Sequence, residues 1–183
     1  MSKYRRWRIA GGMYFFTVVS AQRRRILTTA LARQCLRESL RQVQALYPFR
    51  IECIVLLPDH LHTIWELPRE DHDYSTRWRW IKANFTKLYL ARGGVETLRS
   101  NSRLDKQERG IWQRRFWEHA VRDVEDWKRC ADYVHFNPVK HGLVKRVADY
   151  AWSSFHRYVT LGEYDISWGN ADPCPDWDMP EPK

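Results

Sequence analysis

The feature that most constrains the fold is a pair of extended segments separated by only two residues. Ile51–Leu57 is apolar and β-branched, and His60–Leu67 follows it directly after Pro58 and Asp59. Proline and aspartate favour turns, and a connection this short requires the two segments to pair as antiparallel strands. The sequence therefore predicts a hairpin near the centre of the chain, to which the other segments must add.

The second strand of this hairpin carries His60 and His62 on either side of Leu61. Side chains alternate along a strand, so both imidazoles lie on one face and Leu61 points to the other. Neutral imidazoles placed in this way can bind one divalent metal ion. A histidine pair alone is also consistent with ordinary polar residues on a strand, so the metal interpretation depends on residues elsewhere.

Four strands and two long helices are predicted in the order βαββαβ. Outside the hairpin, Gly11–Ser20 and Ile111–Val121 are aromatic and β-branched, which is typical of strands. The helices are expected to end near Leu46 and Arg92, and each can begin at a capping hydroxyl, from Thr28, Thr29, Ser75 or Thr76. This order predicts an α+β fold, a ferredoxin-like sandwich of an antiparallel sheet with helices on one face.

A third helix is predicted after the last strand. Asp123 can cap a helix from Val124 to Asn137, which Pro138 is expected to end because the residue before proline disfavours helical geometry. A short further helix is expected within Val147–Val159. Residues 93–110 are polar and are expected to form a mobile loop. Residues 1–160 are thus interpreted as one domain and residues 161–183 as an irregular acidic tail.

The formal net charge of +9 is unevenly distributed along the chain. Residues 1–50 hold eleven lysines or arginines and one acid, whereas residues 162–183 hold six acids and one lysine. A basic body favours a polyanionic partner, and tryptophan, which occurs ten times, can stack on the bases of single strands. The sequence therefore indicates a nucleic-acid partner, although solubility alone would also explain the charge.

The basic side chains expected to contact phosphates form two groups. One group lies in the N-terminal third, and the other lies on the second helix, where Trp78, Ile81, Phe85 and Leu88 are expected to face the core. The candidates are Arg5, Arg6, Arg8, Arg23, Arg24, Arg25, Arg77, Arg79, Lys82 and Lys87.

Several classes of protein are not expected. There is no run of about twenty apolar residues, so no membrane span is predicted. The apolar run Met13–Val19 is short and basic residues follow it, which argues against a signal peptide. The four cysteines form no C-x-x-C pair and are typical of reduced thiols. We expect a cytoplasmic protein without membrane contact, as a monomer or a homodimer.

The third helix carries two further candidate residues. Trp127, Ala131 and Val134 form its apolar stripe, and Tyr133 and Asn137 lie four apart on a neighbouring face. A phenol and an amide one turn apart can both face the histidine pair. The alternative, which the spacing alone leaves open, is that the tyrosine packs at the core edge and the asparagine caps the helix.

Three motifs in this order resemble the REP-associated tyrosine transposases, relatives of the HUH single-strand transposases. They are H-L-H after an apolar strand, F-W-E-H-A-V-R-D at 116–123 and D-Y-V-H-F-N-P-V-K-H-G-L-V at 132–144. R-W-x-W-I-K-x-x-F-T at 77–86 and W-S-S at 152–154 are similar as well. The resemblance covers roughly residues 8–158 and leaves the 93–110 loop and the acidic tail outside any motif.

The resemblance implies specific roles. His60 and His62 correspond to the metal ligands of the family, Asn137 to the polar residue that completes the metal site, and Tyr133 to the nucleophile. The implied cofactor is a divalent metal, Mg²⁺ or Mn²⁺. The implied activity is cleavage and joining of single-stranded DNA through a 5′-phosphotyrosine, and the implied partners are hairpins of REP- or BIME-like palindromes. His119, His135 and His141 also lie in these motifs but acquire no role.

Two other functions remain open from the sequence. One is a hairpin-binding module that does not cleave, which would need none of the four candidate residues. The other is a zinc hydrolase with a structural Tyr133, for which no third histidine or carboxylate ligand is evident.

Overall fold

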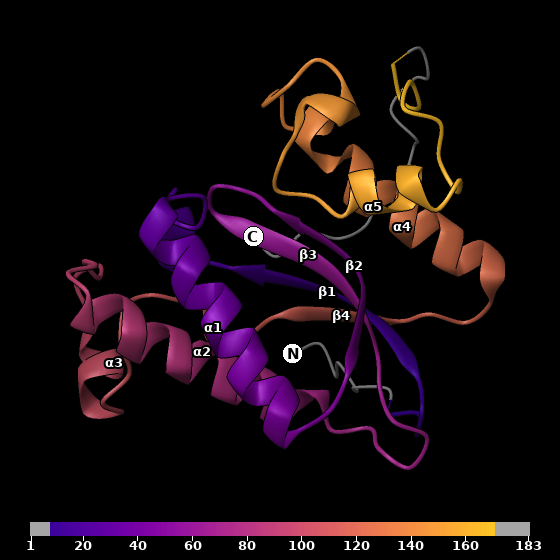
Figure 1. Ribbon diagram of the computed structural model, residues 1–183. Helices are drawn as coiled ribbons and strands as arrows, with labels where there is room; N and C mark the ends of the chain where they lie inside the picture. The colour runs from indigo at the N-terminus through magenta and orange to yellow at the C-terminus, as the bar shows by residue number, and fades with distance from the viewer. Residues whose placement is uncertain (1–7, 171–183) are drawn as a thin grey trace, which may run out of the picture.

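The computed structural model describes residues 8–170, and a four-stranded antiparallel sheet forms its centre (Figure 1). The strands are β1 (Met13–Val19), β2 (Arg50–Leu56), β3 (His60–Glu66) and β4 (Trp117–Ala120). Their order in the sheet is β2-β3-β1-β4, so β1 and β3 are the two inner strands. The predicted ferredoxin-like α+β fold is confirmed.

The predicted hairpin forms the β2–β3 pair. Leu57 donates its backbone N–H to the carbonyl of His60 at 2.8 Å, which closes the turn around Pro58 and Asp59. On its other edge β3 pairs with β1 in a register that places His60 opposite Val19 and His62 opposite Thr17. The two histidines therefore lie on an inner strand, supported from both sides.

Each face of the sheet carries its own hydrophobic core. The helices α1 (Ala30–Leu46) and α2 (Tyr74–Ala91) cover one face, where Phe16, Leu61 and Trp65 are buried. The helix α4 (Val124–Lys140) covers the opposite face, where Phe15 and Ile64 are buried. Leu61 thus points toward α1 and α2, as the alternation predicts, and the adjacent His60 and His62 face α4.

Short helices complete the fold, and the ends of several elements differ from expectation. They are α3 (Asn101–Asp105), within the predicted loop, α5 (Phe155–Thr160), and the 3₁₀ turns η1 (Ala21–Arg23) and η2 (Val147–Asp149). β4 covers four residues of the predicted strand.

Thr29 caps α1 as predicted, but the cap of α2 is Asp73, whose carboxylate accepts the backbone N–H of Thr76 at 3.0 Å. An aspartate accepts this bond at least as well as serine, and it was missed because it lies before the apolar stripe.

Asp123 caps α4 as predicted, but Pro138 does not end it. The helix runs on to Lys140, and His141 and Leu143 donate backbone hydrogen bonds to the carbonyls of Asn137 and Pro138. Proline removes one N–H donor near the end of the helix, and the bonds beyond it preserve the last turn. This extra turn matters because it brings Lys140 to Tyr133 and His141 to His60.

The described residues after α5 pack on α4 and α5. Tyr164 is 9% exposed, and its hydroxyl donates to the carboxylate of Asp132. Trp168 contacts Tyr164, with ring centroids 4.7 Å apart, and Phe136 on α4. The beginning of the predicted acidic tail is therefore part of this core, and the rest lies outside the described residues. Among the described helices, none combines the length and the apolar character that crossing a membrane requires.

Candidate active site

The two histidines of β3 are buried beneath α4. His60 is 2% exposed and His62 is fully buried, and the centroids of their rings lie 4.8 Å apart. The structure thus confirms that they share one face of the strand. Two imidazoles at this separation can bind a single ion between them.

A hydrogen bond to Nδ1 orients each imidazole. The Nδ1 atom of His60 lies 2.7 Å from a carboxylate oxygen of Asp59, and that of His62 lies 2.8 Å from the hydroxyl of Thr17. A carboxylate accepts only, so His60 donates from Nδ1 and its Nε2 atom keeps the lone pair for a ligand. Within residues 8–170, this buried Nε2 atom has no hydrogen-bond partner.

Asp59 is itself supported by a cation. Arg23 donates to its second carboxylate oxygen at 3.1 Å. Burial by itself raises the pKa of the Asp59 carboxyl, but hydrogen bonding and charge from His60 and then Arg23 outweigh it and lower the pKa to about 2. Asp59 is therefore an anion at neutral pH and fixes the ring orientation of His60.

The helix α4 presents its functional side chains at helical spacing. Tyr133, Asn137 and His141 lie at i, i+4 and i+8, so they form one stripe along the helix. At one end the ring of Tyr133 lies 5.2 Å from that of His62, and at the other the ring of His141 lies 5.0 Å from that of His60. The structure therefore brings Tyr133 to the histidine pair.

Tyr133 also packs in the core, as the alternative interpretation expected. It is 4% exposed, and its ring lies 5.8 Å from that of Phe15 at an interplanar angle of 67°. Its hydroxyl, however, accepts a hydrogen bond from Lys140 Nζ at 3.4 Å. The ring is therefore held firmly, with the phenolic oxygen beside a cation.

Asn137 is the third predicted metal ligand. It is 1% exposed, and neither its amide oxygen nor its amide nitrogen has a hydrogen-bond partner in the described part of the chain. A buried amide without partners costs free energy, so such a group calls for an explanation. Two imidazole nitrogens and an amide oxygen suit a divalent cation of intermediate hardness and would leave coordination positions for substrate oxygens.

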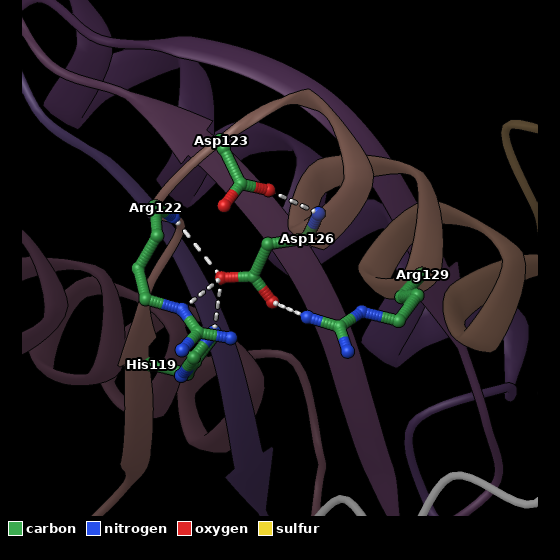
Figure 2. A network of polar contacts seen from close by, with 5 residues as sticks. All are labelled: His119, Arg122, Asp123, Asp126 and Arg129. Atoms are coloured by element: carbon green, nitrogen blue, oxygen red, sulfur yellow. Dashed lines mark hydrogen bonds and ion pairs between the residues drawn. The ribbon is translucent and has the colours of Figure 1, made fainter.

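A second polar cluster lies where β4 meets α4 (Figure 2). The ligand atoms of His119, Asp126 and Cys130 lie within 4.8 Å of one another, a separation that could accommodate a metal ion. Asp126, however, already accepts from His119 Nε2 at 2.8 Å and from the guanidinium groups of Arg122 and Arg129 at 3.1 Å each. Two guanidinium groups on one carboxylate disfavour a further cation, and the cluster fixes the first turn of α4 to the end of β4 (Figure 2).

We expect replacement of Asp126 by Asn to lower the free energy of unfolding by about 2 kcal/mol, the usual scale for a buried hydrogen bond to a charged group. Burial raises the pKa of the Asp126 carboxyl, but hydrogen bonds from Arg122 and His119 outweigh it and hold the pKa well below its usual range. The contribution is therefore present above about pH 4 and is lost as the pH falls. Urea unfolding at pH 7 measures the effect.

The exposed Asp105, changed to Asn, is the matched control and should change the free energy of unfolding little. Equal stabilities for the Asp126 variant and this control would contradict the assigned role of the cluster.

The predicted phosphate-binding residues have different environments in the structure. Arg77 is 1% exposed, forms an ion pair with Asp71 at 2.7 Å and donates to the carbonyl of Pro48. Its predicted availability to DNA is wrong, because these partners and the carbonyl of Asp73 hold its guanidinium group inside the fold. Arg23 pairs with Asp59, and Arg24 donates to the carbonyl of Val95 at 2.7 Å. Arg8 and Arg25 are exposed, and Arg5 and Arg6 lie outside the described residues.

The other three predicted cations of α2 line a groove. Arg79, Lys82 and Lys87 lie along one wall of a groove of about 800 Å³. Its other wall is formed by α3 and by the segment between α3 and β4. This wall adds three cations and two aromatic rings, from Arg103 on α3 and from Arg109, Arg114, Trp112 and Phe116 after it. Arg103 and Arg109 were missed from the sequence because residues 93–110 were interpreted as a loop, and Arg114 was missed because its segment was interpreted as a strand of the sheet. Cations beside aromatic rings suit a nucleic-acid strand.

Comparison with known proteins defines the family. No family model matches the chain. The chain is 45% identical over 169 residues to the REP-associated tyrosine transposase of Escherichia coli K12, covering 92% of this chain and 91% of the relative. It is 42% identical over 170 residues to a Haemophilus influenzae protein named as a putative REP-associated tyrosine transposase, covering 92% and 94%.

A solved structure agrees with this relationship. The structure of a REP-associated tyrosine transposase bound to a REP hairpin has a TM-score of 0.81 and 43% sequence identity, and it covers 100% of this chain and 99% of that chain. Fold and site together define a ferredoxin-like protein with a tyrosine beside a buried histidine pair. The chain belongs to the REP-associated tyrosine transposases.

Proposed function

We propose that this protein is a metal-dependent endonuclease and strand transferase that acts on single-stranded DNA with Tyr133 as nucleophile. The observation that carries this proposal is the position of the Tyr133 ring, 5.2 Å from that of His62. In the same site, the Nε2 atom of His60 and the side-chain amide of Asn137 have no hydrogen-bond partner among the described residues 8–170. Binding alone would not require a buried tyrosine beside potential metal ligands, and this favours an enzyme over the hairpin-binding alternative.

The metal site would comprise His60, His62 and Asn137, with Mg²⁺ or Mn²⁺ as the ion. When bound there, a divalent cation would neutralise charge on the oxygens of the scissile phosphate and help to orient that group. Asp59 and Thr17 would hold the imidazoles in position, because each fixes one ring nitrogen. Phe15 and His62 would restrict the ring of Tyr133, so that its oxygen is presented to phosphorus with little loss of conformational entropy.

The proposed reaction has the polarity that the family resemblance implies. The Tyr133 oxygen forms a bond to phosphorus while the bond from phosphorus to the 3′-oxygen breaks. The phenolic proton leaves the enzyme, and the departing oxygen gains a proton to become a 3′-hydroxyl. The 5′-phosphotyrosine keeps the energy of the broken ester, so a second 3′-hydroxyl can reverse the step without ATP.

The proposed substrate is a hairpin-forming repeat of the REP type. The solved relative at 43% identity is bound to a REP hairpin, which supports the same class of partner here. The α2 groove lies across the sheet from Tyr133 and would hold a part of the DNA remote from the cleaved bond.

The test is incubation with a labelled single-stranded repeat from the source genome and Mn²⁺ or Mg²⁺, followed by denaturing electrophoresis. We expect a covalent protein–DNA band that requires the metal. A protein that binds the hairpin tightly but never forms this band would support the binding-module alternative.

The groove leads to a prediction about salt. For single strands, log K falls with log salt by about 0.7 for each phosphate neutralised. We expect the double variant Arg79→Gln and Lys87→Gln to reduce this slope by about 1.4, because both side chains are exposed on the groove wall.

Arg37→Gln with Arg41→Gln removes the same charge from the exposed side of α1 and serves as the control. Fluorescence anisotropy with an unpaired single strand of the repeat across a salt series measures both slopes. Identical slopes for the two double variants would place the DNA elsewhere.

A further inference from the structure

The search for an additional functional group leads to Lys140, a residue that the sequence did not single out. It is the last residue of α4, and its side chain is placed on the helix because α4 continues through Pro138. Tyr133 and Lys140 are seven residues apart, which is two helical turns, so they lie on the same side of the helix. The extra turn thus brings a cation over the nucleophile.

Two measurements define this contact. Lys140 Nζ lies 3.4 Å from the phenolic oxygen of Tyr133, and it lies 4.7 Å from the centroid of the same ring. The first distance permits a hydrogen bond to the oxygen that would attack phosphorus. The side chain is exposed overall, so it reaches the buried tyrosine from the solvent side.

The chemistry of Tyr133 needs such a group. A phenol has a reference pKa near 10, so at neutral pH the attacking oxygen must acquire its negative charge inside the site. The proposed metal ligand His62 contacts the ring of Tyr133 from β3. Lys140 comes instead from the end of α4 and supplies a fixed positive charge and a donor at the oxygen itself.

We propose that Lys140 is a catalytic residue that donates a hydrogen bond to the Tyr133 oxygen whenever this oxygen carries negative charge. This inference rests on the proposed function. During cleavage, Lys140 stabilises the oxygen as it forms the bond to phosphorus and the 3′-oxygen departs. During joining, an incoming 3′-oxygen displaces the tyrosine, and Lys140 stabilises the same oxygen as it leaves. Lys140 takes up and releases no proton in either step. In cleavage, Tyr133 loses one proton and the departing 3′-oxygen gains one to become the 3′-hydroxyl.

The proposal requires equal effects in both directions. We expect Lys140→Met to slow single-turnover cleavage at saturating hairpin by about 10- to 100-fold, the range for loss of one hydrogen bond to a charged group. Joining from the preformed phosphotyrosine should slow by a similar factor. Lys140→Arg should recover part of both rates, because a guanidinium group also donates. Hairpin affinity should change by less than about threefold, since one screened exposed charge contributes little.

Lys145→Met is the matched control, because it removes an exposed lysine five residues further along, beyond the end of α4. Cleavage by Lys140→Met at the rate of this control would overturn the proposal, as would a defect confined to hairpin affinity. If the unaltered protein forms no covalent adduct, the proposed function fails and this inference fails with it. If the unaltered protein does form the adduct, the Lys140 variants test this inference alone.

Discussion

Replacement of Tyr133 by Phe is expected to abolish the covalent protein–DNA adduct and to reduce strand cleavage by a factor on the order of 10⁴ or more, the scale seen when a nucleophile is removed. The change deletes only the hydroxyl. The ring contacts with Phe15 and His62 remain, so the helix should keep its position on the sheet. Hairpin affinity should therefore stay close to that of the unaltered protein.

Tyr150→Phe is the matched control for this variant. It also removes a buried hydroxyl, which donates to the carbonyl of Leu56 at 2.7 Å, but it lies outside the proposed site. It should cost about 1 kcal/mol in the free energy of unfolding and leave the adduct intact. An adduct of normal yield in Tyr133→Phe would mean that another residue attacks the DNA.

The second large effect is expected at the metal site. His60→Ala and His62→Ala should each reduce Mn²⁺ affinity by more than about 100-fold, because losing even an outer-shell partner costs about 10- to 100-fold. Asp59→Asn should fall within that smaller range, since it disturbs the orientation of His60 and leaves its nitrogen in place. Titration calorimetry with Mn²⁺ measures all three without reference to DNA cleavage.

His156→Ala is the control, because His156 is exposed on α5, away from β3. Urea unfolding of each variant shows whether a lost imidazole has destabilised the core instead. Unchanged Mn²⁺ affinity in a folded His62→Ala protein would contradict the assignment of this residue as a ligand.

Much of the fold followed from local sequence rules. The two-residue connection at Pro58 and Asp59 required the β2–β3 hairpin, and strand alternation then placed both histidines on one face. Asp123 correctly predicted the start of α4, and the spacing of Tyr133 and Asn137 predicted that both lie on one side of this helix. What spacing could not provide was the register of β3 against β1 or the side of the sheet that α4 covers.

The errors have identifiable physical causes. Pro138 was expected to end α4, and this hid the turn that carries Lys140 and His141 to the site. An arginine is usually exposed, but Arg77 is buried because Asp71 and the carbonyl of Pro48 satisfy its guanidinium group. The partners of a buried charge come from distant segments, so composition and periodicity did not indicate them. Counting i+7 and i+8 from Tyr133 through the proline would have found Lys140 and His141.

The central claim is that Tyr133 forms the bond to DNA, and peptide mapping of the covalent adduct tests it most directly. Trypsin cleaves after Arg129 and Lys140, and the peptide between them, Cys130–Lys140, contains a single tyrosine, Tyr133. We predict that mass spectrometry of the digested adduct finds this peptide joined to the 5′-phosphate of the DNA fragment. An oligonucleotide on any other peptide, or one attached through its 3′-phosphate, would contradict the account.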